Sequence, residues 1–147
     1  MGDKRSRERG FTLLEIMLVL ILLSGAGFVL LIKLPIHLEK ERLAFATTQL
    51  LEEVRDTRQA ALAENNWYEI LFYTSNEIHN YKIFREGTRV KDIDLSKGIK
   101  FVGQPDPVRF LANGRTRLGS TIVLTNPSGE QKSVIIAPVG MRIRESK

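Results

Sequence analysis

The feature that most constrains this chain is a run of twenty-two residues, Phe11 to Ile32, in which the only charged side chain is Glu15. As an α-helix this run would be about 33 Å long, at roughly 1.5 Å per residue. That length matches the hydrocarbon core of a bilayer, which is about 30 Å thick. Residues 1–10 are rich in Lys and Arg, so the N-terminus is expected in the cytoplasm and the remainder of the chain outside. The sequence therefore predicts a single membrane-spanning helix over residues 11–32.

The residues that follow the run predict an amphipathic helix over residues 33–65. Pro35 has no backbone N–H, so we expect it to kink or interrupt the helix between the two segments. Beyond Ile36 the buried positions are expected to recur at spacings of three and four, which is the pattern of a helix with one buried stripe. The stripe consists of Leu43, Thr47, Leu50, Val54, Thr57 and Ala61. We expect Asn65-Asn66 to end this helix.

Residues 66–147 predict a β-rich head. The period changes to two at Tyr68, and Gly, Pro and Asn mark the turns. Short strands are expected at residues 68–73, 81–84, 99–102, 108–111, 121–125, 133–137 and 139–144. The turn Asn126-Pro127-Ser128-Gly129 should join two of them as a hairpin. The predicted fold class is α+β, in which the long N-terminal helix packs on a small antiparallel β-sheet or β-sandwich head.

The composition excludes several kinds of functional site. There is no cysteine, which rules out disulfides, thiol catalysis and thiolate metal sites. His37 and His79 are the only histidines, so neither a metal cluster nor a cofactor is expected. Acidic pairs such as Glu52-Glu53 have no accompanying nucleophile, and we therefore expect a structural protein and not an enzyme. Residues 1–10 contribute +2 of the net charge of +5, and the remaining +3 is too small to indicate nucleic-acid binding by itself.

Glu15 needs a physical explanation, because a carboxylate inside hydrocarbon costs several kcal/mol unless it is paired or close to the interface. Two interpretations are open. Glu15 could lie one helical turn inside the membrane and extend to the headgroups, or it could pair with the positive charge of a processed N-terminus. Opposite charges attract strongly in a low dielectric, so the second interpretation predicts an assembly contact between subunits.

The segment Gly10-Phe11-Thr12-Leu13-Leu14-Glu15, placed between a basic leader and an apolar helix, resembles the start of type IV pilins and pseudopilins. The resemblance implies that a membrane-embedded prepilin peptidase cuts after Gly10, removing residues 1–10, and N-methylates the new terminus at Phe11. It implies that Glu15 then meets the terminal amine of a neighbouring subunit as a helical filament grows. The implied partners are other pilins or pseudopilins, the prepilin peptidase and an inner-membrane assembly platform.

Further segments occur in an order that is similar to one branch of this superfamily. They are Leu34-Pro35, Gln49-Leu50-Leu51, Arg58-Gln59-Ala60-Ala61, Ile70-Leu71-Phe72, Val108 to Arg115, and the closing Gly140 to Arg144. The branch is that of the GspH/FimT-type minor pilins, and in particular the ComGD-type competence pseudopilins. The resemblance implies a head of two small antiparallel sheets and a minor subunit near the filament tip. It favours competence and DNA uptake as the pathway, with type II secretion or a type IV pilus as alternatives.

A DNA-binding head is the second functional hypothesis. Some FimT-type pilins bind DNA through arginines in a C-terminal Gly-Arg-x-Arg segment, and Gly140 to Arg144 differs from it by one extra residue after the glycine. The candidate phosphate-binding residues are Arg142, Arg144, Arg115, Arg117 and Lys147. The alternative is that these are solvated charges on an edge strand, which discourage aggregation. The aromatic residues of the head are interpreted as half-buried sheet residues in preference to a base-stacking platform; they are Trp67, Tyr68, Phe72, Tyr73, Tyr81 and Phe84.

A third hypothesis is an ordinary secreted domain. Ser24-Gly25-Ala26 resembles a signal-peptidase site, and cleavage there would release a soluble protein that begins near Gly27. The apolar run continues past this site to Ile32, however, and Glu15 would lie inside the apolar part of the signal peptide. Both features favour cleavage after Gly10.

Overall fold

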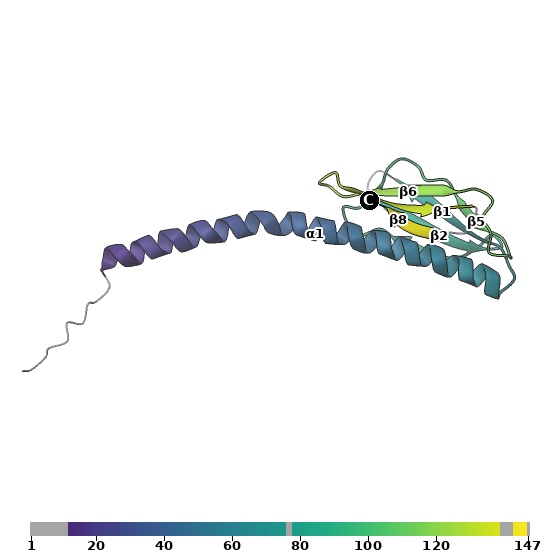
Figure 1. The fold of residues 1–147 in the computed structure, drawn as a ribbon, viewed down its shortest axis with the longest axis horizontal. Helices are drawn as coiled ribbons and strands as arrows, with labels where there is room; N and C mark the ends of the chain where they lie inside the picture. The colour runs from purple at the N-terminus through teal and green to yellow at the C-terminus, as the bar shows by residue number, and fades with distance from the viewer. Residues whose placement is uncertain (1–11, 76–77, 139–142, 147) are drawn as a thin grey trace, which may run out of the picture. The chain divides into compact units, whose positions relative to one another are not determined.

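The computed structural model describes residues 12–75, 78–138 and 143–146, and gives the backbone alone for residues 25–36. The chain divides into two compact units, residues 1–36 and 37–147. In the described residues there is one helix, α1 (Leu13–Ala63), which contributes to both units. All the strands belong to the second unit, where Figure 1 shows them beside the C-terminal part of α1.

Pro35 was expected to kink or interrupt the helix, and the interruption is contradicted because α1 continues through it. Proline removes one backbone donor, but its fixed φ is close to that of a helix. Helix propagation is cooperative, and long helical segments lie on both sides of the missing hydrogen bond. The loss of one bond is therefore insufficient to end α1 at this position.

The C-terminus of α1 is capped by two asparagines. Asn65 adopts a positive φ of 48°, which asparagine tolerates better than most residues. The N–H of Asn66 donates to the carbonyl of Ala61 at 3.1 Å, and the N–H of Asn65 donates to that of Leu62 at 3.4 Å. These are the two hydrogen bonds of a Schellman motif. They confirm the predicted helix end at Asn65-Asn66.

The predicted stripe of α1 forms one side of the core of the second unit. All six of its members are buried: Leu43, Thr47, Leu50, Val54, Thr57 and Ala61. The two threonine hydroxyls are satisfied within the helix, where Thr47 Oγ1 donates to the Leu43 carbonyl and Thr57 Oγ1 donates to the Glu53 carbonyl. Since a buried hydroxyl without a partner is costly, these bonds allow threonine to serve as a core residue.

Within the described residues, the head consists of two four-stranded antiparallel sheets, which confirms the α+β prediction. Sheet A has the order β3 (Thr88–Asp94), β2 (His79–Arg85), β1 (Tyr68–Thr74), β5 (Val108–Phe110). Sheet B has the order β4 (Lys100–Phe101), β6 (Ser120–Thr125), β7 (Gln131–Ile136), β8 (Ile143–Ser146). The inner faces of both sheets pack with the stripe of α1 in a single hydrophobic core.

Two of the strands differ from the predictions. The sequence analysis missed β3, because only Ile93 of its seven residues is buried and the strand shows no apolar alternation. Its register with β2 shifts between Ile83 and Phe84, so Val90 has no partner on β2 and its side chain is exposed. The final strand was expected at residues 139–144 and instead covers Ile143–Ser146, while residues 139–142 lie outside the described part of the chain.

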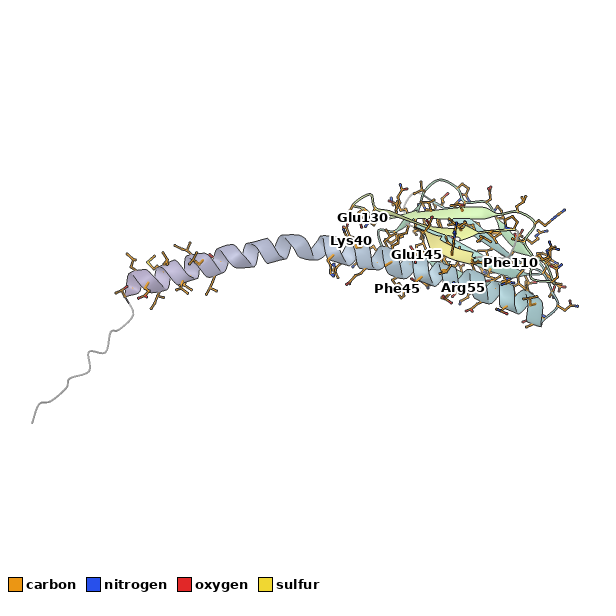
Figure 2. The ribbon with its side chains drawn as sticks, in the orientation of Figure 1. Lys40, Phe45, Arg55, Phe110, Glu130 and Glu145 are labelled. Carbon is orange, nitrogen blue, oxygen red and sulfur yellow. The ribbon has the colours of Figure 1, made fainter. Side chains whose placement is uncertain are left out.

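Polar contacts attach the head to α1 at both ends of the interface. At the tip of the β6–β7 hairpin, Lys40 Nζ lies 2.7 Å from the carboxylate of Glu130, a pair labelled in Figure 2. Near the end of α1, Arg58 Nε donates to the carbonyl of Gly114 at 3.2 Å. Gly114 has a φ of +67°, and a Cβ there would lie 2.6 Å from Cγ of Leu62. Glycine is therefore required where this loop approaches the helix.

His79 joins the two sheets. Its Nδ1 accepts a hydrogen bond from the N–H of Phe101 at 3.0 Å, and its ring lies 5.8 Å from the Phe101 ring. The Phe101 ring in turn makes an edge contact of 5.4 Å with Phe72 of sheet A. Because Nδ1 must be unprotonated to accept this bond, the junction between the sheets depends on a neutral histidine.

The head is expected to lose stability on acidification through His79. Burial, and secondarily the positive charge of Lys100, lower the pKa of His79 below its usual value of 6.5. The unfolded chain therefore binds the proton more readily, and the free energy of unfolding should fall as the pH drops below about 6.5. Urea unfolding between pH 7.5 and 5 would measure this, and His79→Gln should flatten the dependence in that window. An unchanged slope in His79→Gln would exclude this histidine as the cause.

Candidate functional site

The start of α1 is organised by Thr12. The N–H of Glu15 donates to the carbonyl of Thr12 at 3.0 Å and to its Oγ1 at 3.3 Å, and the N–H of Ile16 donates to the same carbonyl at 3.2 Å. Thr12 is thus the N-cap, and Thr12-Leu13-Leu14-Glu15 has the sequence of a capping box. The sequence analysis missed this role, although the Thr-x-x-Glu spacing indicates it. The cap fixes the first helical residue at Leu13.

Glu15 lies in the first turn of α1 with its side chain exposed. A carboxylate is favoured there by the partial positive charge of the helix N-terminus. Its neighbours are apolar, and Ile16, Val19 and Leu20 line a shallow hollow beside it. Among the described residues, no cation contacts the Glu15 carboxylate. Gly10 and Phe11, the predicted cleavage site, lie outside the described part of the chain.

The first part of α1 is an apolar surface without an intramolecular partner in the described part of the chain. Its large apolar side chains are between 47% and 77% exposed: Leu13, Leu14, Ile16, Met17, Leu18, Val19, Leu20, Ile21, Leu22 and Leu23. Apolar surface in water costs roughly 25 cal/mol per Å², and a contiguous patch of this kind marks a site that contacts a membrane or another protein.

The first part of α1 coincides with most of the predicted membrane span. Within the described residues, no helix combines the length and the apolar character needed to cross a bilayer. The predicted span, Phe11–Ile32, includes Phe11 and the side chains of residues 25–32, which lie outside the described part of the chain. The span therefore stays a prediction.

The described basic residues that were predicted to bind phosphate lie on two different segments of the head. Arg115 and Arg117 follow β5 in the loop before β6, whereas Arg144 lies on β8, where its register partner is Ile135. None of these three arginines has a carboxylate partner among the described residues. Arg142 and Lys147, the remaining candidates, lie outside the described part of the chain. No described contact joins Arg144 to the other two, so the predicted patch stays a prediction.

The aromatic residues of the head divide between the two faces of sheet A. Tyr68, Phe72 and Tyr81 are buried in the core. Trp67 and Phe84 are half-buried and Tyr73 is exposed, on the opposite side of the sheet from the core. Burial of half of the set agrees with the interpretation that these are sheet residues. Within the described residues no group of His, Asp or Glu side chains has the arrangement of a metal site.

Comparison with known proteins finds matches to the N-terminal segment and to the fold of this chain. Residues 5–24 match the prokaryotic N-terminal methylation motif. The fold is similar to that of the minor pseudopilin EpsH from the type 2 secretion system of Vibrio cholerae, with a TM-score of 0.57 and 12% identity over 71% of this chain and 96% of that one. The match to a protein family is thus confined to residues 5–24, and the likeness over the rest of the chain is one of fold.

A second solved structure has a similar fold. The type IV minor pilin FimU of Pseudomonas aeruginosa matches with a TM-score of 0.57 and 16% identity, over 74% of this chain and 91% of FimU. No protein with curated annotation matches the sequence. At these identities the likeness shows the fold, while the motif at residues 5–24 adds the features of the N-terminus.

Proposed function

We propose that this chain is a minor, structural subunit of a type IV filament machine, assembled through the N-terminal part of α1. The observation that carries the proposal is Glu15, a carboxylate with apolar neighbours that no described cation contacts. A carboxylate that is moved into an apolar bundle of helices must gain a positive partner or lose stability. The partner must therefore come from elsewhere in the assembly.

Processing of the N-terminus would create that partner. In this proposal the prepilin peptidase hydrolyses the Gly10–Phe11 bond, which leaves a carboxylate on Gly10 and a free amine on Phe11, and the amine is then methylated. A secondary amine remains protonated at neutral pH and keeps its positive charge. The amine of one subunit then pairs with Glu15 of a neighbouring subunit, where the low dielectric strengthens the attraction.

The exposed apolar side chains of residues 13–23 suit the helix to two environments, the membrane before assembly and the filament after it. Before assembly they lie in the cytoplasmic membrane, with the N-terminus in the cytoplasm and the head outside. After assembly they pack against equivalent helices of neighbouring subunits, so the apolar surface remains covered throughout. The assembly platform of the inner membrane is proposed to move the subunit between these two states.

The machine to which the subunit belongs is a further part of the proposal. We favour a ComGD-like role in competence and DNA uptake, because the segments along the chain occur in an order similar to that of the ComGD-type pseudopilins. EpsH belongs to a type 2 secretion system and FimU to a type IV pilus, and both of these systems are alternatives. Direct capture of DNA by Arg142 and Arg144 stays a prediction, because Arg142 lies outside the described residues.

Mass spectrometry of the mature N-terminus tests the proposal. We expect a chain that begins at Phe11 and carries one additional methyl group on its α-amine. A terminus near Gly27 would instead indicate a secreted soluble domain. A mature protein that keeps residues 1–10 would remove the amine on which Glu15 depends, and with it the proposed function.

A further inference from the structure

We propose that the outer face of sheet A is a docking surface for the head of another filament subunit. The outer face is the side of the sheet opposite the core. In β1 the residues Tyr68, Ile70 and Phe72 are buried, so the alternate residues Leu71 and Tyr73 lie on the outer face. The apolar members of this face are Trp67, Leu71, Tyr73 and Phe84. The inference rests on the proposed function, since it assigns a contact between heads that a filament brings together.

Two cations lie over two of the aromatic rings on this face. The guanidinium carbon of Arg109 is 4.8 Å from the centre of the Trp67 ring, and Nζ of Lys82 is 5.1 Å from the centre of the Tyr73 ring. Arg109 is held in this position by Glu69, whose carboxylate lies 2.9 Å from its Nη2. The face is therefore ordered before any partner binds, which lowers the entropic cost of association.

The charges of the outer face cancel. It carries three cations and three carboxylates, which are Lys82, Arg89, Arg109, Glu69, Asp92 and Asp94. Asp92 Oδ2 lies 3.2 Å from Lys82 and 3.4 Å from Arg89, and so neutralises both in part. Nucleic acids bind to surfaces with a net positive charge, whereas the charged strand residues of this face sum to zero and Arg117, at its edge, adds a single positive charge. A neutral face with Trp, Tyr and Arg at its centre fits the core of a protein–protein contact and an uncharged partner surface.

An exposed leucine extends the surface at one edge. Leu118 is 78% exposed, and with Pro107, Arg109 and Arg117 it lines a shallow hollow beside the pair of Arg109 and Trp67. A leucine this exposed gains most from a partner that covers it. The arginine and the tryptophan together form an anchor of the kind that contributes most of the energy in protein interfaces, and the leucine lies at its edge.

The absence of cysteine from the natural chain permits a direct test. Leu118→Cys places a unique thiol at the edge of the docking surface, and a photo-crosslinking maleimide attached to it in sheared filaments should form covalent adducts. Mass spectrometry should identify the partner as another protein with an N-terminal methylation motif, or as a second copy of this chain. Thr121→Cys is the matched control, because Thr121 is exposed on the outer face of sheet B.

A second substitution tests the anchor itself. In the Leu118→Cys chain, Arg109→Ala should lower the adduct yield at least about tenfold, the effect expected for an interface anchor. Lys100→Ala, which removes an exposed cation of β4, should leave the yield unchanged. If the chain is present in filaments, two results would overturn the inference. One is an adduct yield from Leu118→Cys no higher than that from Thr121→Cys, and the other is the formation of adducts with DNA. Absence of the chain from filaments would contradict the proposed function, and the docking surface with it.

Discussion

Replacing Glu15 with Gln is expected to leave the subunit inserted in the membrane and cleaved after Gly10, but to lower its recovery in filaments at least about tenfold. Glutamine has nearly the shape of glutamate and can serve at the same position of a capping box, so the helix start should persist. The substitution removes only the charge. The protonated amine of the neighbouring subunit would then be buried without a partner, and breaking such a pair costs about 3–5 kcal/mol.

The structure supplies a matched control for this experiment at Thr12. Thr12→Ala removes the side-chain cap and keeps the carboxylate, and it should cost about 1 kcal/mol of helix stability with much less effect on assembly. Immunoblots of the membrane and sheared-filament fractions would measure both variants. If Thr12→Ala assembled poorly while Glu15→Gln assembled normally, the cap would be the essential feature, and the charge-pairing mechanism would be wrong.

Replacing Leu50 with Ala is expected to destabilise the head by about 2–5 kcal/mol, the range for a leucine removed from a core. Leu50 is fully buried in the core between α1 and the sheets. Alanine is a good helix former, so α1 itself should not be weakened, and the loss measures packing between the helix and the sheets. Urea unfolding of the full chain in detergent, followed through the fluorescence of Trp67, the sole tryptophan, would report on the head.

Phe45 provides the comparison on the same helix. Its side chain is 63% exposed, and Figure 2 shows it on the side of α1 away from the sheets. Phe45→Ala should therefore change the free energy of unfolding by no more than about 0.5 kcal/mol. Equal losses for Leu50→Ala and Phe45→Ala would contradict the assignment of the buried stripe.

Much of the fold could be predicted because buried residues recur in the sequence with the period of the helix or strand that contains them. Each residue of the predicted stripe, from Leu43 to Ala61, is buried in the structure. The strands with alternating apolar residues were found for the same reason, and Asn65-Asn66 ends α1 as expected. In the candidate site, Glu15 was recognisable because a lone acid among apolar residues is costly without a partner.

The features that escaped prediction are those in which the deciding interaction lies elsewhere in the chain. The strand β3 is hydrogen-bonded to β2 but exposes most of its side chains, so its sequence resembles that of a loop. Pro35 is tolerated because helix on both sides outweighs one missing bond. The pairing of Arg109 with Trp67 depends on the register between β5 and β1, which the sequence of neither strand specifies.

The irregular edge of β3 would matter in the proposed filament, where many similar heads lie close together. A long, regular edge strand would offer its free backbone groups to any neighbouring sheet. Here the unpaired Val90 interrupts the row of free groups, and Lys91 is held 2.5 Å from Glu53 of α1. Uncontrolled edge-to-edge pairing of the sheets of neighbouring heads is thereby discouraged. Growth of the proposed filament then depends on the apolar N-terminal part of α1.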